Sequence, residues 1–159
     1  MPKPAIGPSR LSQILQKLQS DPKPVLRSSL KKLKLTYAVR NDHFGARHFV
    51  KEELPRIRYV NPTIAIEVDK FPKTEADTWQ SSLVMEFEDG SKKSFTMDNK
   101  WSSAIFTNVM DAAGTQAWDR WKADRKAAHL PIVDGPPNAR SPPPPSQTRK
   151  GSGAAAVLP

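Results

Sequence analysis

The sequence contains no cysteine, which excludes disulfide bonds, zinc sites built on thiolates and every dithiol redox reaction. It also lacks any apolar run near the roughly 18 residues that a helix needs to cross a bilayer. We therefore expect a soluble or peripheral protein without a membrane span. A chain of 159 residues can form one domain of ordinary size, and a second domain is not expected.

Acidic residues are scarce at the N-terminal end of the chain. Residues 1–36 carry eight Lys or Arg and a single acid, Asp21, whereas residues 37–114 carry ten basic and twelve acidic residues. Residues 115–159 again have more basic residues than acidic ones, seven against three, and the net charge is +9. Two basic ends around a nearly neutral middle favour binding to a polyanion, although such charge can also serve solubility alone.

Residues 1–29 are predicted to form a basic N-terminal extension with one short amphipathic helix that stops near Pro22. Its apolar residues recur at helical spacing, at Leu11, Ile14, Leu15 and Leu18. A basic, amphipathic and nearly acid-free N-terminus resembles a mitochondrial targeting sequence. It equally suits a mature extension that docks on a partner, and the two interpretations are compatible.

The predicted domain forms around residues 44–71, where the hydrophobic period changes from that of a helix to that of a strand. Helical spacing relates the apolar residues Phe49, Val50, Leu54 and Ile57. Pro55 removes an amide donor, so we expect the helix to kink or restart with Pro55 as the first residue of the new turn, and Asn61-Pro62 to end it. From Thr63 the residues alternate, and one strand face holds Ile64, Ile66 and Val68.

A strand is also predicted before this helix, over residues 31–40, where leucines alternate with lysines. Residues 41–44 then form a turn, with Asn41 or Asp42 available to cap the helix. Strand, helix and strand at this spacing make a right-handed crossover. We therefore expect the two strands to be parallel.

Residues 82–97 read as a hairpin whose loop length follows from the side-chain pattern. A three-residue loop, Glu88 to Gly90 with Gly90 left-handed, places the apolar residues of both strands on one face. A second helix is predicted over 101–113, capped by Asp98 or Asn99 and ended by Gly114. A third helix, 115–129, carries Trp118 and Trp121 among basic residues.

Strand, helix, strand, hairpin and helix in this order predict an α/β fold. With the first strand central, the sheet is four-stranded and mixed, and the fold is a reduced thioredoxin-like one. We expect this domain to span 30–114, with a basic helix at 115–130. A Pro/Gly/Ala-rich tail follows at 131–159, and it cannot form a core.

Two runs of residues carry a family resemblance. The sequence GARHFV at 45–50, followed by LPRIRYVNP at 54–62, closely resembles the mitochondrial ribosomal protein family that shares its domain with an accessory subunit of respiratory complex I. The resemblance covers the chain from about Leu30 to Gly114 and continues through the hairpin.

The resemblance implies a structural protein of the mitochondrial ribosome in the matrix, bound to ribosomal RNA and to neighbouring mitoribosomal proteins. Members occur in both ribosomal subunits, and the long Pro-rich tail and N-terminal extension are more similar to the fungal large-subunit member. The alternatives are a small-subunit protein, an accessory subunit of complex I, or a free-standing nucleic-acid-binding module. No cofactor or small-molecule substrate is expected.

Catalysis and metal binding are both disfavoured by the residues themselves. Thioredoxin-like redox chemistry needs a thiolate where the first strand meets its helix, and this chain has none. Asp42, His43 and His48 are the other candidates, and we interpret them as a cap and two surface imidazoles. The two histidines are five residues apart and no second cluster completes a ligand set, so no metal site is predicted.

RNA contact is the chemistry that the basic residues favour, because Lys and Arg neutralise phosphates without reading sequence. Trp118 and Trp121 could stack on unpaired bases or pack the third helix on the domain, and packing is the favoured alternative. The edge of the sheet at Ile64 to Val68 could also accept a strand from a partner. The predicted RNA-binding residues are Lys3, Arg10, Arg27, Lys31, Lys32, Lys34, Arg40, Arg47, Lys51, Arg58, Trp118, Arg120, Trp121, Lys122, Arg125 and Lys126.

Overall fold

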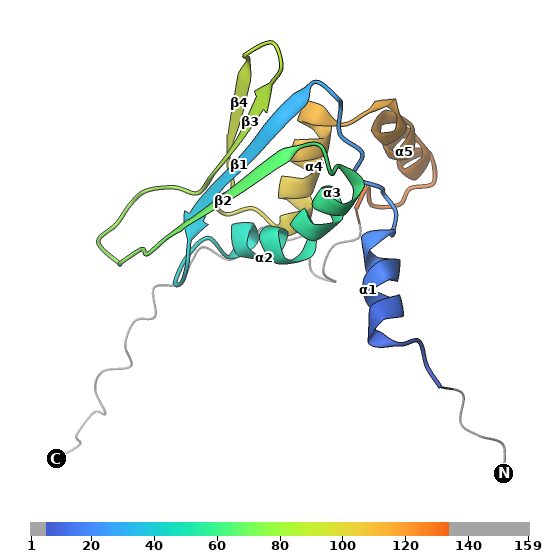
Figure 1. Ribbon diagram of the computed structural model, residues 1–159, viewed down its shortest axis with the longest axis horizontal. Coiled ribbons are helices and arrows are strands. Elements are labelled where there is room, and N and C mark those ends of the chain that lie inside the picture. Colours follow the sequence, from blue (N-terminus) through green and yellow to red (C-terminus); the bar gives the residue numbers. More distant parts are fainter. Residues whose placement is uncertain (1–5, 134–159) are drawn as a thin grey trace.

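The computed structural model describes residues 6–133, so the predicted tail lies outside the described residues from position 134 onwards. Figure 1 shows the elements in chain order. They are α1 (Arg10–Leu18), β1 (Leu30–Ala38), α2 (Phe44–Glu52), α3 (Leu54–Val60), β2 (Ala65–Phe71), β3 (Ser82–Phe87), β4 (Lys92–Thr96), α4 (Ser102–Ala113) and α5 (Gln116–Ala127).

The four strands form one mixed sheet in the order β2-β1-β3-β4. The central strand β1 runs parallel to β2 and antiparallel to β3, and β3 pairs with β4 as a hairpin. This arrangement confirms the predicted α/β fold with a thioredoxin-like sheet. It also confirms that β2 lies at an edge, because β1 is its neighbour on one side and no strand lies on the other within residues 6–133.

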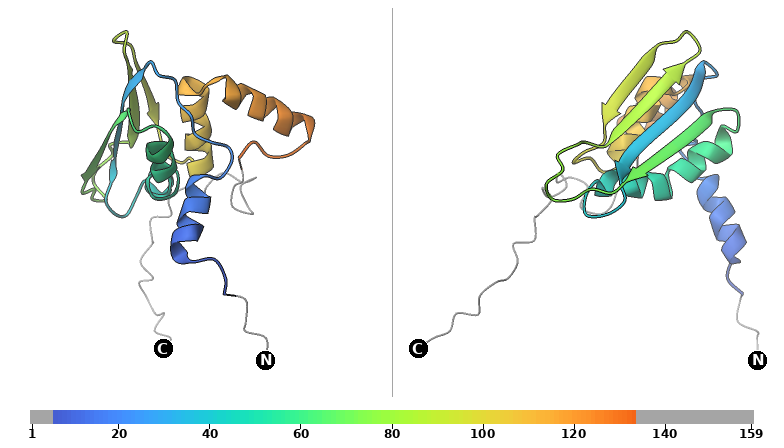
Figure 2. Two further views of the ribbon diagram at one scale, coloured as in Figure 1. Left: turned by 45° about the vertical axis from the view of Figure 1, so that its right-hand side comes forward. Right: turned by 60° about the vertical axis from the view of Figure 1, so that its left-hand side comes forward.

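The helices lie on one side of the sheet. In both views of Figure 2, α2, α3 and α4 cover one face, α5 lies beyond α4, and the opposite face carries no helix from the described part of the chain. Alternation along the strands buries Leu33 and Leu35 of β1 with Leu83 and Met85 of β3 beneath the helices. The helices add the side chains that complete this core, chiefly Phe49, Ile57, Ile105, Phe106, Val109 and Met110.

The interruption predicted at Pro55 is confirmed, and it starts one residue earlier than expected. Helix α2 ends at Glu52 and α3 begins at Leu54, so Pro55 occupies the first turn, where its missing N–H has no intrahelical partner to lose. Asn61 is the residue at which α3 ends. The change to strand periodicity after Pro62 is confirmed by β2.

The hairpin has the predicted loop. Phe87 N–H donates to the carbonyl of Ser91, Leu83 pairs with Phe95, and Gly90 has φ +84°, the left-handed conformation that glycine adopts without strain. Odd-numbered residues therefore face odd-numbered residues, and the apolar side chains share the face under the helices.

Both predicted helix caps are wrong. The N-cap of α2 is His43 at φ 56°, and the N-cap of α4 is Trp101, in neither case with a side-chain hydrogen bond to the helix. The carboxylates expected to cap have other partners, because Asp42 accepts from Lys73 and Asp98 accepts from Ser81. His43 is also buried, 3% exposed, rather than a surface imidazole.

Candidate interaction surfaces

A buried polar cluster fills the corner where β1 meets α2. Nδ1 of His43 accepts the Ala38 N–H at 2.9 Å, and its Nε2 lies 3.3 Å from Oδ1 of Asp98. Because Nδ1 is an acceptor, the neutral ring carries its proton on Nε2, which faces that carboxylate. The imidazole thus links the end of β1 to the loop between β4 and α4.

Lys73 connects a third loop to the same corner. Its ammonium donates to Oδ2 of Asp42 at 2.6 Å and to the carbonyl of Trp79 at 2.9 Å, and the Trp79 ring meets the His43 ring edge-on at 4.9 Å. Burial lowers the pKa of His43, while the charges of Asp98 and Asp42 oppose that shift. Burial would raise the pKa of Asp42, but its hydrogen bonds from Lys73 and from the His43 N–H lower it overall.

This corner is the place where a thioredoxin-like oxidoreductase carries its redox thiols, and here its polar atoms bond to one another instead. Among the described residues, no group of three or more His, Cys, Asp or Glu side chains is placed to hold a metal ion. The cluster joins three loops of the domain. The arrangement therefore has a structural role.

Gly45 explains the start of the GARHFV sequence. A Cβ at this position would lie 1.7 Å from the carbonyl oxygen of Lys100, in the loop before α4. Only glycine permits this approach of two backbones, because the atom in the way is main chain and cannot rotate aside. The next residue, Ala46, is fully buried and so must also be small.

A second buried polar cluster ties the N-terminal segment to α3. Arg56, 6% exposed, donates from its guanidinium to the carbonyls of Ser20 and Pro22 at 2.9 and 2.7 Å and to Glu53 at 2.6 Å. Its guanidinium also lies 5.5 Å from the centre of the Phe106 ring. Burial raises the pKa of Glu53, although the Arg56 charge acts against that shift.

Asn61 completes this second cluster. Its side-chain amide donates to the carbonyl of Pro24 at 2.7 Å and accepts the N–H of Leu26 at 2.9 Å, with a further bond to the carbonyl of Ile57. Pro22, Pro24 and Leu26 are buried. Residues 20–26 therefore lie against the domain, although they belong to the segment 1–29 that was predicted as an extension.

Helix α5 carries the largest group of predicted RNA-binding residues. Arg120 and Lys126 are exposed and form no ion pair within residues 6–133. Lys122 is held by Asp111 at 2.8 Å and by Asp119 at 3.6 Å, and the hydrogen bond with Asp111 raises its pKa. Lys122 is thus less available to a phosphate than its two neighbours.

Both tryptophans of α5 pack on the domain. Trp118 is 3% exposed, meets Phe106 edge-on at 6.0 Å and donates its indole N–H to Asp111. Trp121 is half-buried, donates to the carbonyl of Ile132 and lies under the guanidinium of Arg125, 5.0 Å from the ring centre. A base has no access to the buried ring of Trp118, and the cation over Trp121 covers one of its faces.

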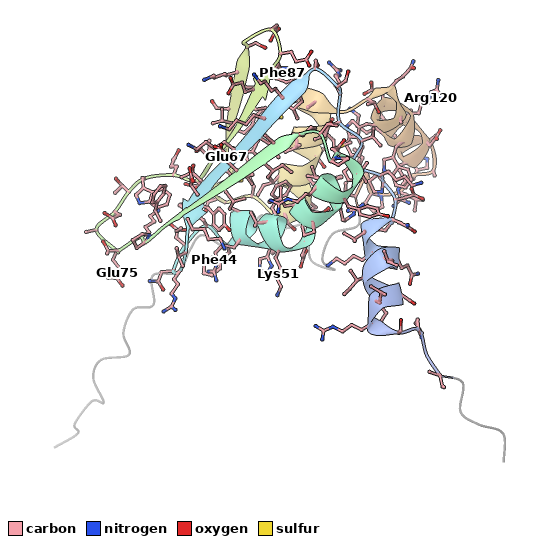
Figure 3. All side chains as sticks on the ribbon, in the orientation of Figure 1. Phe44, Lys51, Glu67, Glu75, Phe87 and Arg120 are labelled. Atoms are coloured by element: carbon pink, nitrogen blue, oxygen red, sulfur yellow. The ribbon has the colours of Figure 1, made fainter. Side chains whose placement is uncertain are left out.

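A second group of predicted residues lies on α1, α2 and α3. Arg10, Lys51 and Arg58 are exposed and have no ion-pair partner among the described residues, while Arg47 stacks over the ring of Phe44 at 5.5 Å. Figure 3 shows Lys51 on α2 and Arg120 on α5 at well separated places, so these groups do not form one continuous patch.

The third group, on β1, faces the side of the sheet that carries no helix. Lys32 pairs with Glu67 at 2.7 Å and Lys34 pairs with Asp69 at 3.1 Å, across the β1–β2 ladder. The hydrogen bond with Glu67 raises the pKa of Lys32. These two lysines are partly neutralised within the domain, which weakens their case as phosphate ligands.

The other predicted residues lie apart from these groups. Arg27 donates to the carbonyl of Gly114 and lines a hollow of about 620 Å³ beside the hairpin loop. Lys31 and Arg40 are exposed at the two ends of β1. Lys3 lies outside the described residues.

A groove lies at the β2 edge. The sequence predicted that this edge could accept a strand, but it did not predict the groove. It encloses about 670 Å³ and is lined by Leu18, Val50, Leu54, Pro55, Arg58, Tyr59, Val68 and Lys70. These residues come from α1, α2, α3 and β2, so no single stretch of sequence indicates the groove. The one local signal is Tyr59, a large ring that the helical pattern of α3 leaves on the exposed side.

The segment that contains α2 and α3, the helices of both buried clusters, matches a known family. Residues 46–102 match the family described as the mitochondrial ribosomal protein L51 / S25 / CI-B8 domain. This part of the chain is therefore similar to that domain. The match begins inside α2 and ends at the start of α4, so β1 lies before it. No curated protein sequence matches the chain.

The L51 / S25 / CI-B8 domain is shared by proteins of the mitochondrial ribosome and by a subunit of complex I. It is a structural domain of large mitochondrial assemblies, and the family therefore supports a mitochondrial location and a structural role. None of the helices within residues 6–133 is long and apolar enough to span a membrane.

Proposed function

We propose that this chain is a structural constituent of the mitochondrial ribosome, in its large subunit and in the matrix, and that its exposed basic residues bind ribosomal RNA. The observation that carries the proposal is α5, a helix whose Arg120 and Lys126 are exposed and have no ion-pair partner within residues 6–133, in a chain that also contains a segment similar to a ribosomal family. Phosphate binding requires cations that are free to exchange counterions for the nucleic acid backbone.

The proposed RNA-binding residues differ in how available their side chains are to a phosphate or a base. The stronger candidates are the exposed cations that form no ion pair with another described residue, namely Arg10, Lys31, Arg40, Lys51, Arg58, Arg120 and Lys126. Lys32, Lys34 and Lys122 already neutralise carboxylates, and Trp118 is buried. RNA contact through these last four would require the domain to give up its own interactions.

We favour the large subunit over the small one because the long Pro-rich tail and the N-terminal extension are more similar to the fungal large-subunit member. Within the proposed organisation, the domain spans 30–114 and residues 20–26 lie against it, while the rest of the segment 1–29, the basic helix 115–130 and the tail 131–159 contact RNA and neighbouring proteins. The complex I alternative gives no use for eight Lys or Arg within residues 1–36. The proposal includes no catalytic step and no cofactor.

Sedimentation of a mitochondrial lysate through sucrose tests the assignment, with the chain followed by mass spectrometry. We expect co-migration with the large ribosomal subunit at moderate salt and partial release at high salt, because electrostatic contacts weaken as counterions compete. Co-migration with the small subunit would correct the subunit alone. Migration with complex I, or at the top of the gradient, would overturn the ribosomal proposal.

The RNA contact is tested separately with purified full-length chain and transcribed large-subunit ribosomal RNA. Replacing Arg120 and Lys126 by glutamine should reduce the salt dependence of binding by about 0.9 in the logarithmic slope for each phosphate that is no longer neutralised. The matched control replaces Lys92 and Lys93 on β4 by glutamine, which changes the charge equally at a distant place. Equal effects of the two double variants would contradict a role for α5.

A further inference from the structure

We propose that the groove at the β2 edge, together with the apolar face of α1, is a docking site for an extended segment of a neighbouring protein. The segment has apolar side chains that enter the groove and acidic residues that meet its cationic rim. This inference concerns a protein contact, and it holds for whichever mitochondrial assembly contains the chain.

The apolar face of α1 is the first observation. No residue of this helix is buried, and Leu11, Ile14 and Leu15 are 67%, 48% and 39% exposed. Leu18, one or two turns further on the same face, lines the groove, so the apolar face leads directly into it. Figure 1 shows α1 extending away from the sheet, and the exposed fractions of its side chains show that residues 6–133 leave that face largely uncovered. Exposed apolar surface on this scale marks an interaction site.

The orientation of the helix is fixed where it meets the domain. Nε2 of Gln19 lies 3.4 Å from the hydroxyl of Tyr59, and Arg56 holds the carbonyls of Ser20 and Pro22 directly after the helix. The groove and the α1 face are therefore presented as one surface, and a partner does not have to order them.

The edge strand supplies backbone hydrogen bonds beside the groove. The carbonyl of Phe71 accepts from the N–H of Val39, the residue directly after β1, so alternation along β2 turns the N–H and C=O of Ile66, Val68 and Lys70 away from β1. Val68 and Lys70 also line the groove with their side chains. A strand added at this edge would bond to their main chain and place alternate side chains in the groove.

The two edges of the sheet differ in length and in what lies beside them. Strand β4 has five residues and begins with the exposed Lys92 and Lys93, and charged residues at an edge are a common defence against strand addition. Strand β2 has seven residues, of which Glu67, Asp69 and Lys70 are charged, and an apolar groove lies beside it. The longer edge is the one that the apolar surface adjoins.

The charge of the residues that line the groove indicates which kind of molecule binds there. Arg58 and Lys70 carry positive charge among the eight lining residues, and none of the eight is an acid. Residues 1–5 and 134–159 of this chain contain four basic residues and one acid, so its own ends match the rim poorly. A second copy docked about a two-fold axis would face like charges with like charges. The apolar floor disfavours RNA, whose backbone presents phosphates. An acidic and apolar protein segment fits both features.

Photo-cross-linking from the groove tests the proposal. The full chain carries benzoylphenylalanine in place of Tyr59, 49% exposed, and is cross-linked in intact mitochondria before mass spectrometry maps the adduct. We expect one defined segment of another protein, with acidic residues flanking apolar ones. Benzoylphenylalanine in place of Leu130, also 49% exposed, is the control and should not give this product.

Variants on the rim decide whether the predicted charge recognises that segment. Arg58→Glu with Lys70→Glu should lower the yield about tenfold, while Lys92→Glu with Lys93→Glu should leave it unchanged. An adduct with RNA, with a second copy, with this chain's own ends or with a segment lacking acidic residues would overturn the proposal, as would no adduct.

Sedimentation of the same cross-linked sample separates this inference from the proposed function. An acidic protein segment cross-linked to chain that migrates away from the ribosome would overturn the ribosomal assignment and support the docking site. Ribosomal migration without that adduct would do the reverse.

Discussion

The two buried polar clusters lie at opposite ends of the α2–α3 pair, and they differ in chemistry. At the start of α2, His43 contacts Asp98, with Asp42 and Lys73 beside it, so the cluster contains an imidazole whose pKa is lowered by burial. At the end of α3, Asn61 bonds only to backbone groups, and Arg56 donates to the carbonyls of Ser20 and Pro22. The first cluster joins loops of the domain, whereas the second attaches the N-terminal segment to it.

This difference between the two clusters predicts which of their interactions weaken at low pH. Loop-to-loop contacts through an imidazole weaken when the ring must take up a proton, while amide contacts to carbonyls do not. The contrast also separates two parts of the N-terminal segment, because residues 20–26 are anchored by the second cluster and α1 has no buried residue.

The largest effect should come from Asn61→Ala, which breaks the second cluster. It leaves the N–H of Leu26 and the carbonyl of Pro24 buried without their partner, and each such group costs about 1–3 kcal/mol. We expect the free energy of unfolding to fall by about 3 kcal/mol in urea titrations. Asn108→Ala, at a half-exposed position on α4, is the control and should change it by less than about 0.5 kcal/mol. Similar losses in both variants would remove the anchoring role of Asn61.

An intermediate effect, dependent on pH, should come from the first cluster. Burial lowers the pKa of His43 in the folded protein, whereas an unfolded histidine titrates near 6.5. Below about pH 6.5 the unfolded chain therefore binds a proton that the folded chain does not, and the free energy of unfolding should fall as the pH falls towards the folded pKa.

His43→Asn should remove this part of the pH dependence. Asparagine tolerates the left-handed φ of 56°, and its side-chain oxygen can accept the Ala38 N–H in place of Nδ1. Urea titrations at pH 7.5 and 5.5 give the difference, with His48→Asn on the exposed face of α2 as the control. A variant that loses stability on acidification as steeply as the parent would show that another group is responsible.

The smallest effect on stability should come from α1. Leu11→Gln with Leu15→Gln changes two exposed side chains of a helix that buries none, so the free energy of unfolding should stay within about 0.5 kcal/mol of the parent. The same variant should lose the cross-link from position 59. A large loss of stability would mean that α1 belongs to the folded core, and the contrast with residues 20–26 would disappear.

Periodicity alone was sufficient for the elements and their order. The break at Pro55, the strand after Pro62 and the three-residue hairpin loop all follow from local rules about proline, alternation and glycine, because each depends on residues close in the chain. The family resemblance at 45–62 also lies almost wholly within the segment that matches the L51 / S25 / CI-B8 domain.

The predicted helix caps are wrong because the proposed capping residues bond to residues that are distant in the chain. Asp42 and Asp98 lie just before the helices, where capping residues are usually found. Their carboxylates instead accept hydrogen bonds from Lys73 and Ser81, which are distant in the chain. The positions of the basic residues posed the same difficulty, since Lys32 and Lys34 meet Glu67 and Asp69 only when β1 and β2 pair. Asn61 was predicted only to end the helix, and its bonds to Pro24 and Leu26 form only when the N-terminal segment folds over α3.

The α/β class, the strand order around a central first strand, the lack of a thiol and the resemblance to the L51 / S25 / CI-B8 domain all followed from the sequence, because they rest on residue types and local spacing. Only the tertiary structure decided that His43 is buried, that Trp118 packs inward, that α1 leaves its apolar face uncovered and that a groove opens at β2. Each of these depends on which distant segments meet, and burial and pairing are properties of the assembled chain.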